Sequence, residues 1–158
     1  AGLRLGKALQ RDMVAVPVGA PQKMVVVAAP AYLKAHGTPA TPQDLLAHDC
    51  IRLRFLSHGR FLEWRLGTRE RAAVVDVRGR LIFSEMRSVL DAATRGLGLA
   101  YVFEQYAREP LRRGELVKVL ERHGNTIEPF YVYYPHRAHM PGKLRAFVEF
   151  LRAVNKAA

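Results

Sequence analysis

One cysteine with two histidines near it is the first group of residues that could do chemistry. Cys50 follows His48 by two residues, and His58 comes eight residues later. An imidazole can activate a thiol as a nucleophile when the two side chains meet. Cys50, however, opens the apolar segment 50–55, where a cysteine is more often a buried and unreactive packing residue. The pattern predicts a structural thiol, and a single cysteine forms no disulfide within the chain.

His136 and His139 form an H-x-x-H pair, a spacing that suggests a zinc site. Such a pair needs a helix that holds both rings on one face and a third ligand beside them. Here Pro135 and Pro141 flank the pair, and a loop bounded by prolines provides no such frame. We expect two surface histidines and no metal.

Gly96-Leu97-Gly98 has a glycine spacing that suggests a dinucleotide-binding loop. In that loop the glycines follow a strand and open a helix. Here they end an expected helix and precede an expected strand, so the order is reversed. The pattern predicts a helix stop followed by a strand, and no cofactor.

Ser84 and two arginines fit the binding of a small anion. Ser84 follows the apolar segment 81–83 and is expected to cap a helix over 85–95, which places its hydroxyl beside free backbone N–H groups. Arg54 lies near the end of one expected strand, and Arg4 near the end of the first. Arginine holds a carboxylate through two parallel hydrogen bonds. These residues predict an anion-binding cleft, and they include no nucleophile with a base beside it, so we expect no enzyme.

Alternating strands and helices must position these residues. The continuous apolar run Met24–Ala28 indicates a strand buried on both faces, whereas Pro30 and Gly37 mark the start and end of a short helix. Signals of this kind predict an α/β fold. The expected strands are 1–6, 13–18, 24–28, 50–55, 61–66, 73–77, 81–83, 97–102, 116–120 and 130–134, and the expected helices are 31–36, 41–47, 85–95, 105–113 and one after Gly142.

The composition excludes several classes of protein. The 158 residues are 49% apolar and 25% charged, which is ordinary for a globular chain and unlike disordered or fibrous ones. Apolar runs stay well below the ~18 residues that a membrane span needs. We therefore expect a soluble, cytoplasmic chain without membrane contact.

The formal charge of +11 raises the question of nucleic-acid binding. The excess of basic residues is five in 1–60, three in 61–120 and three in 121–158, so no block carries it. A dedicated phosphate-binding face normally shows clustering. Residues 89–108 faintly imitate a helix-turn-helix, but the aromatic and β-branched segment 99–103 suits a strand better. Direct DNA contact by this chain stays an alternative.

The order of the segments is that of a known family. The chain opens on an expected strand with no initiator methionine or signal peptide, which favours a fragment. PAYLKAHG is followed by P-x-D-L-x-x-H-x-C-I, and the remaining pieces are DMVAVPVG, Trp64, VRGRLIFSE, VLDAATRGLGLAYVFEQ, LRRGELVKVLE and YVYYPHRAHMPGKLRAFVEFLR. Over nearly its whole length the sequence resembles the effector-binding domain of LysR-type transcriptional regulators.

The resemblance implies a two-lobed α/β fold like that of periplasmic solute-binding proteins of type 2, with mixed sheets and two crossover strands. Residues 1–17 and 129–158 would form a first lobe, incomplete at its N-terminal side, and 18–128 the second. The domain would bind a small anionic inducer, such as a carboxylate, between the lobes. It would act as a homodimer or homotetramer and reach DNA through an N-terminal helix-turn-helix domain outside this chain.

By position, the resemblance assigns seven residues to the ligand cleft: Arg4, Arg54, Ser57, His58, Ser84, Val102 and Phe103. Relatives commonly have proline where Phe103 stands, and a small polar residue and arginine where His136 and Ala138 stand. Phe103 would narrow the cleft, so an inducer known for relatives does not carry over. The alternative of another class is a periplasmic solute-binding protein of a transport system, which shares the fold and needs a secretion signal.

Overall fold

The structure is a computed structural model that describes residues 2–5, 13–67, 72–135 and 141–157. The histidines of the H-x-x-H pair, His136 and His139, lie outside these ranges, as does Ala138. Among the described residues, every helix is too short or too polar to cross a bilayer.

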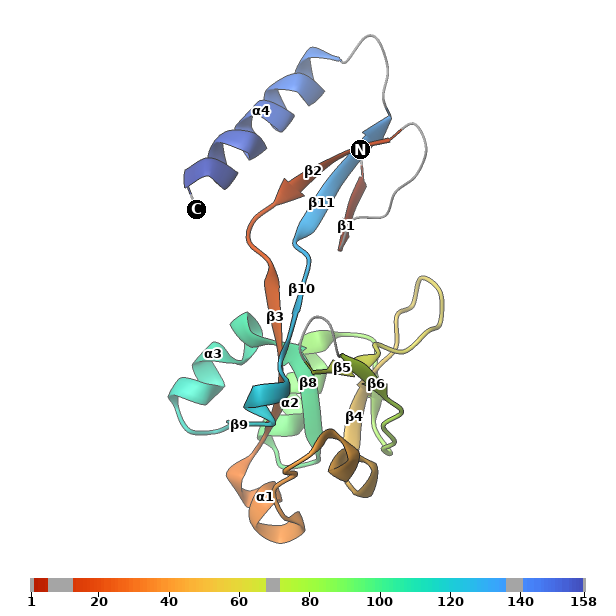
Figure 1. Ribbon diagram of the computed structural model, residues 1–158, viewed down its shortest axis with the longest axis vertical. Coiled ribbons are helices and arrows are strands. Elements are labelled where there is room, and N and C mark those ends of the chain that lie inside the picture. The colour runs from red at the N-terminus through yellow and green to blue at the C-terminus, as the bar shows by residue number, and fades with distance from the viewer. Residues whose placement is uncertain (1, 6–12, 68–71, 136–140, 158) are drawn as a thin grey trace. The chain divides into compact units, whose positions relative to one another are not determined.

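The described chain divides into two compact units, which Figure 1 shows with a sheet each. The first unit comprises Ala1–Gln22 and Ile127–Ala158, and the second comprises Lys23–Thr126. These boundaries fall inside two strands that run from one unit into the other, β3 (Gln22–Ala28) and β10 (Asn125–Ile127). That the units correspond to the two lobes expected from the family, with boundaries at 17/18 and 128/129, stays a prediction.

The first unit is a three-stranded antiparallel sheet with one long helix. Its strands are β1 (Gly2–Leu5), β2 (Met13–Val18) and β11 (Phe130–Pro135), in the order β1-β11-β2. The helix α4 (Gly142–Ala157) packs on β2. Apolar residues at helical spacing on α4 meet alternating residues of the strands, and the buried cluster consists of Val16, Val132, Tyr134, Val148 and Leu151.

The second unit is built on a mixed sheet with the strand order β10-β3-β8-β4-β7. The strands β4 (Cys50–Leu53), β7 (Ile82–Phe83) and β8 (Leu99–Phe103) run parallel, whereas β3 pairs with β8 in the antiparallel sense. A short strand, β9 (Val117–Val119), also pairs with β3. The strand β10 lies between the expected strands 116–120 and 130–134, where the sequence predicts no strand because Asn-Thr-Ile carries no apolar alternation.

Helices complete the second unit (Figure 1). They are α1 (Pro30–His36), the 3₁₀ helices η1 (Pro42–Ala47) and η2 (Glu121–His123), α2 (Met86–Thr94) and α3 (Glu104–Arg112); a hairpin of β5 (Trp64–Leu66) and β6 (Ala73–Val75) lies beside the main sheet. The helix α2 packs against β4, β7 and β8. Its apolar side gives the core Val89, Leu90, Ala92 and Ala93, which lie in one cluster with strand residues such as Val27, Ile51, Ala100 and Val102.

Candidate ligand-binding site

The parallel strands β4, β7 and β8 bring three of the predicted residues to one edge of the sheet. Arg52 pairs with Ile82 and Leu53 with Phe83, so Arg54 and Ser84 follow the ends of neighbouring strands. Phe103 ends β8, on the other side of β4. Ligands of open α/β sheets bind in the crevice outside the carboxyl ends of the strands. This carboxyl edge of β4, β7 and β8 is therefore the candidate site in the second unit.

Arg54 is fixed through its backbone and exposed through its side chain. Its N–H donates to the carbonyl oxygen of Phe83 at 2.8 Å, and the residue forms an isolated antiparallel bridge with Phe61. The backbone is thus held between β7 and the returning chain, while the guanidinium extends into solvent. An exposed arginine on a rigid base suits the capture of an anion.

Ser57 and His58 lie in the turn that joins Arg54 to Phe61, and both are exposed. The turn is tied by backbone bonds from Phe55 to Arg60 at 2.9 Å and from Gly59 to Phe55 at 2.8 Å. The N–H of Arg60 donates to Nδ1 of His58 at 3.2 Å, and the His58 ring lies 5.2 Å from that of Phe55. These bonds order the turn near the carboxyl edge of the sheet.

The structure corrects the expected role of Ser84. The residue is exposed in a bend after β7, but the N-cap of α2 is Glu85, with φ −126° and ψ 135°, and the cap forms no side-chain hydrogen bond. The helix starts one residue later than expected because Glu85 keeps an extended backbone. Ser84 therefore does not cap α2, and the first N–H groups of this helix keep their capacity for an anion.

Glu104, which sequence reasoning did not single out, occupies the start of the next helix. It is the first residue of α3, directly after β8, and contacts Lys118 and Lys23. The hydrogen bond from Lys118 is the main cause that lowers the pKa of Glu104, and the charges of both lysines act in the same direction. The chain's own carboxylate thus sits in the first turn of α3. In α2 the first turn contains no acidic residue, and the N-cap Glu85 forms no side-chain cap hydrogen bond.

The remaining predicted residues differ in their surroundings. Val102 is fully buried in the core cluster of the second unit, so only its backbone is placed to meet a ligand. Phe103 is half-buried, with its ring 6.1 Å from that of Tyr106. Arg4 lies on β1 opposite Tyr131, in the first unit. The roles of all seven residues in ligand binding stay predictions.

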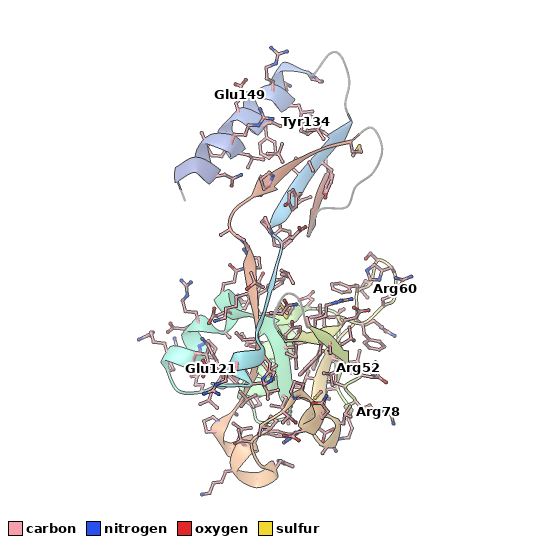
Figure 2. All side chains as sticks on the ribbon, in the orientation of Figure 1. Arg52, Arg60, Arg78, Glu121, Tyr134 and Glu149 are labelled. Atoms are coloured by element: carbon pink, nitrogen blue, oxygen red, sulfur yellow. The ribbon has the colours of Figure 1, made fainter. Side chains whose placement is uncertain are left out.

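The basic side chains of the second unit are spread along the sheet, as Figure 2 shows for three of them. In the view of Figure 2, Arg52 lies between Arg60 above it and Arg78 below it, on one side of this unit. The Arg52 guanidinium is 3.6 Å from the centre of the Phe61 ring, a cation–π contact that holds it on the sheet. Arg54, at the end of β4, is therefore better placed than Arg52 to meet a ligand at the carboxyl edge.

Cys50 is a structural thiol, as predicted. It is 1% exposed, and its Sγ–H donates to the carbonyl oxygen of Leu45 at 3.6 Å. Burial, with a smaller contribution from the charge of Asp49, raises the pKa of Cys50 to about 12. A thiol that stays protonated is a poor nucleophile and a poor metal ligand. The described residues contain no group of three or more His, Cys, Asp or Glu arranged to hold a metal ion.

With this geometry established, comparison with known proteins identifies the family. The family model of the LysR substrate binding domain matches residues 1–156. A putative transcriptional regulator of Pseudomonas aeruginosa is 40% identical over 152 residues, which cover 96% of this chain and 50% of that protein.

The chain belongs to the LysR substrate-binding domain family. The uncharacterized HTH-type transcriptional regulator YcaN of Escherichia coli is 34% identical over 96% of the chain and 49% of its own length. The chain thus spans about half the length of these curated relatives.

Solved structures show the LysR-type fold. The full-length virulence activator AphB of Vibrio cholerae is similar with a TM-score of 0.80 and 29% identity, over 97% of this chain and 51% of that one. The regulatory domain of AphB from Vibrio vulnificus has a TM-score of 0.78 and 27% identity, over 97% of this chain and 74% of that one. The predicted fold class, mixed α/β as in effector-binding domains of LysR-type regulators, is confirmed.

Proposed function

We propose that this LysR-family chain is the ligand-sensing part of a DNA-binding transcriptional regulator and that it binds a small anion such as a carboxylate. The observation that supports the ligand class is the carboxyl edge of β4, β7 and β8. There Arg54 and Ser84 follow adjacent strands, and α2 begins without a side-chain cap or an acidic first turn. Free N–H groups at a helix N-terminus together with an arginine favour a carboxylate.

The proposed mechanism is a population shift. A ligand that binds one conformation of the domain more tightly raises the population of that conformation. In the whole protein this change would alter how a homodimer or homotetramer presents helix-turn-helix domains, which lie outside this chain, to DNA. The regulator would work in the cytoplasm. The relatives reported above are regulators, which favours this function over solute binding for transport.

A ligand screen with matched variants tests the proposed site. Small mono- and dicarboxylates are added to the chain, and the shift of the melting temperature and the heat of binding are measured. We expect Arg54→Ala to weaken binding of an active carboxylate about tenfold or more, because it removes a charged hydrogen bond. Arg78→Ala is the control and should leave the affinity unchanged, because the carbonyl oxygen of Arg78 accepts the N–H of Cys50 at the start of β4 and Arg78 therefore lies at the amino end of that strand.

Two results would count against this function. Equal weakening by Arg54→Ala and Arg78→Ala would show a general charge effect and no site at the carboxyl edge. If none of the carboxylates in the screen shifts the melting temperature of the chain, the anion-sensing proposal is wrong. For the DNA part, the whole protein should bind its own promoter region in a gel-shift assay, with an affinity that changes when the ligand is added.

A further inference from the structure

A second pocket opens at the opposite edge of the same parallel strands, the amino edge. Its volume of about 320 Å³ is at the lower end of the range for small-molecule sites. The walls come from α1 and from the residues just before or at the start of β4, β7 and β8. They include Tyr32, His36, Asp49, Arg80, Leu81 and Leu97. None of these residues is among the seven that the resemblance assigns to the ligand cleft, and none belongs to the carboxyl-edge site.

The base of this amino-edge pocket is rigid. The Asp49 carbonyl oxygen accepts a hydrogen bond from the N–H of Leu99 at 2.9 Å, and the N–H of Cys50 donates to Arg78 at 2.9 Å. Gly98 approaches the same backbone so closely that a β-carbon there would lie 2.4 Å from the Asp49 carbonyl oxygen. Three segments that are far apart in the sequence are therefore joined at Asp49 and Cys50, and a ligand would meet a preformed surface.

The negative charge on the wall of the pocket is the Asp49 carboxylate, which pairs with Arg80. Its Oδ2 accepts one hydrogen bond from Nη2 of Arg80 at 3.1 Å, and the Arg80 side chain is 85% exposed. An ion pair this exposed contributes little free energy, so Arg80 can leave without much loss. Gly96 and Leu97, just past the end of α2, also line the pocket. The partial negative charge of a helix C-terminus favours a cation there.

Tyr32 and His36 form the aromatic part of the pocket wall. Tyr32 is buried and stacks on His36 with 4.4 Å between ring centres. The Tyr32 hydroxyl accepts the backbone N–H of Asp49 at 3.1 Å, which fixes the ring beside the carboxylate. The apolar side chains Leu81 and Leu97 also line the pocket and can cover the body of a ligand.

We propose that the amino-edge pocket binds a small organic cation, an amine, amidine or guanidine on an apolar body, whose charged group takes the place of Arg80 at Asp49. The Arg80 guanidinium already shows the chemistry that this carboxylate accepts. The site is separate from the proposed anion site, since the two lie at opposite ends of the parallel strands. A cation bound here would act as a second signal on the same sheet.

The test uses three probes of nearly equal shape: benzamidine, neutral benzamide and anionic benzoate. Binding to the 158-residue chain is measured by two-dimensional NMR of backbone amides and by calorimetry. Benzamidine should shift the resonances of residues 49, 80, 81, 96 and 97, and benzamide should not. Asp49→Asn should weaken the binding of benzamidine about tenfold or more, because the charged partner is lost. Arg80→Ala should strengthen the binding of benzamidine about threefold, since a competing cation is removed.

The variants also separate the alternatives. Arg87→Ala removes an exposed arginine of α2 that does not line the pocket, and it should leave benzamidine binding unchanged. If the chain binds benzoate and Arg80→Ala abolishes that binding, the pocket is an anion site and the proposal is overturned. The proposal is also overturned if Asp49→Asn binds benzamidine as tightly as the unmodified chain does. The same holds if no probe shifts the amide resonances of the residues that line the pocket. Because Arg80 is exposed, its variant remains informative if Asp49→Asn proves unstable.

Discussion

Gly79 lies against the backbone of Cys50 with no space for a side chain between them. A β-carbon on Gly79 would be 2.0 Å from the carbonyl oxygen of Cys50 and 2.7 Å from its nitrogen. Next to this contact, the N–H of Cys50 donates to the carbonyl oxygen of Arg78 at 2.9 Å. The segment before β7 is thereby held on the start of β4, and this contact sets the base of the amino-edge pocket.

Gly79→Ala should therefore destabilise the chain more than an ordinary glycine substitution. A methyl group forced against backbone atoms costs about 3 kcal/mol, the upper part of the range for overpacking. Gly96→Ala is the control: its φ of +74° is strained for alanine, but no atom lies within 4 Å, so about 1 kcal/mol is expected. Urea denaturation measures both. Equal losses would show that the contact with Cys50 does not constrain the fold.

The Cys50 thiol should not react in the folded chain. With its pKa raised to about 12 by burial, almost none of it is thiolate at about pH 8. We expect a disulfide reagent such as Ellman's to label no thiol in the native chain and one in concentrated guanidinium chloride. The rate of labelling should follow the rate of unfolding. Fast labelling of the native chain would mean that the thiol is accessible.

Glu104 should stabilise the fold at neutral pH and lose that effect in acid. Lys118 and Lys23 favour the ionised form and lower its pKa below the ordinary 4.5. The unfolded chain then takes up a proton first as the pH falls, so the stabilisation is complete above about 4.5 and disappears as the pH falls through the folded pKa. Glu104→Gln should cost about 0.5–1 kcal/mol at neutral pH, discounted because these side chains are partly exposed.

The comparison for Glu104 is a second carboxylate, Glu115. It lies 3.9 Å from Arg113 in an exposed pair, for which the expected contribution is close to zero. Glu115→Gln should leave the free energy of unfolding unchanged at neutral pH. If both variants lose the same free energy of unfolding, or if the loss from Glu104→Gln persists in acid, Lys118 and Lys23 are not the source of the stabilisation by Glu104.

Local patterns in the sequence were sufficient to predict most of the elements. The run at Met24–Ala28 lies in β3, and Pro30 and Gly37 bound α1 as expected. Thr41 forms a capping box with Asp44, although the helix that follows is 3₁₀. The signals failed where neighbours in space decide the structure. The strand β10 exists because it pairs with β3, and its three residues are too few to show an alternating pattern.

The candidate sites at the two edges of the sheet show the same limit of prediction from the sequence. Arg54 and Ser84 could be singled out because each follows its own apolar strand in the sequence. The amino-edge pocket could not be predicted, since Tyr32, Asp49 and Leu97 come from separate segments that meet only through sheet pairing. The start of α2 after Glu85 depends on one backbone conformation, which residue types alone do not determine.

His48 should make the stability of the second unit depend on pH near neutrality. Its Nδ1 lies 3.2 Å from the Tyr32 hydroxyl, whose oxygen already accepts the N–H of Asp49. The hydroxyl proton is then free to be donated to Nδ1, which requires a neutral ring. Burial is the main cause that lowers the pKa of His48 below 6.5, and the charge of His36 acts in the same direction.

Since the unfolded chain binds the proton more readily, the stability associated with His48 is complete above about 6.5 and is lost as the pH falls through the folded pKa. His48→Gln keeps an acceptor for Tyr32 and removes the titration, so its free energy of unfolding should fall less between about pH 8 and pH 5.5 than that of the unmodified chain. His58→Gln, an exposed histidine in the turn after β4, should behave like the unmodified chain. The same slope in His48→Gln would assign the acid sensitivity to other groups, whereas a flatter slope in His48→Gln alone would show that the Tyr32–His48 contact depends on a neutral imidazole.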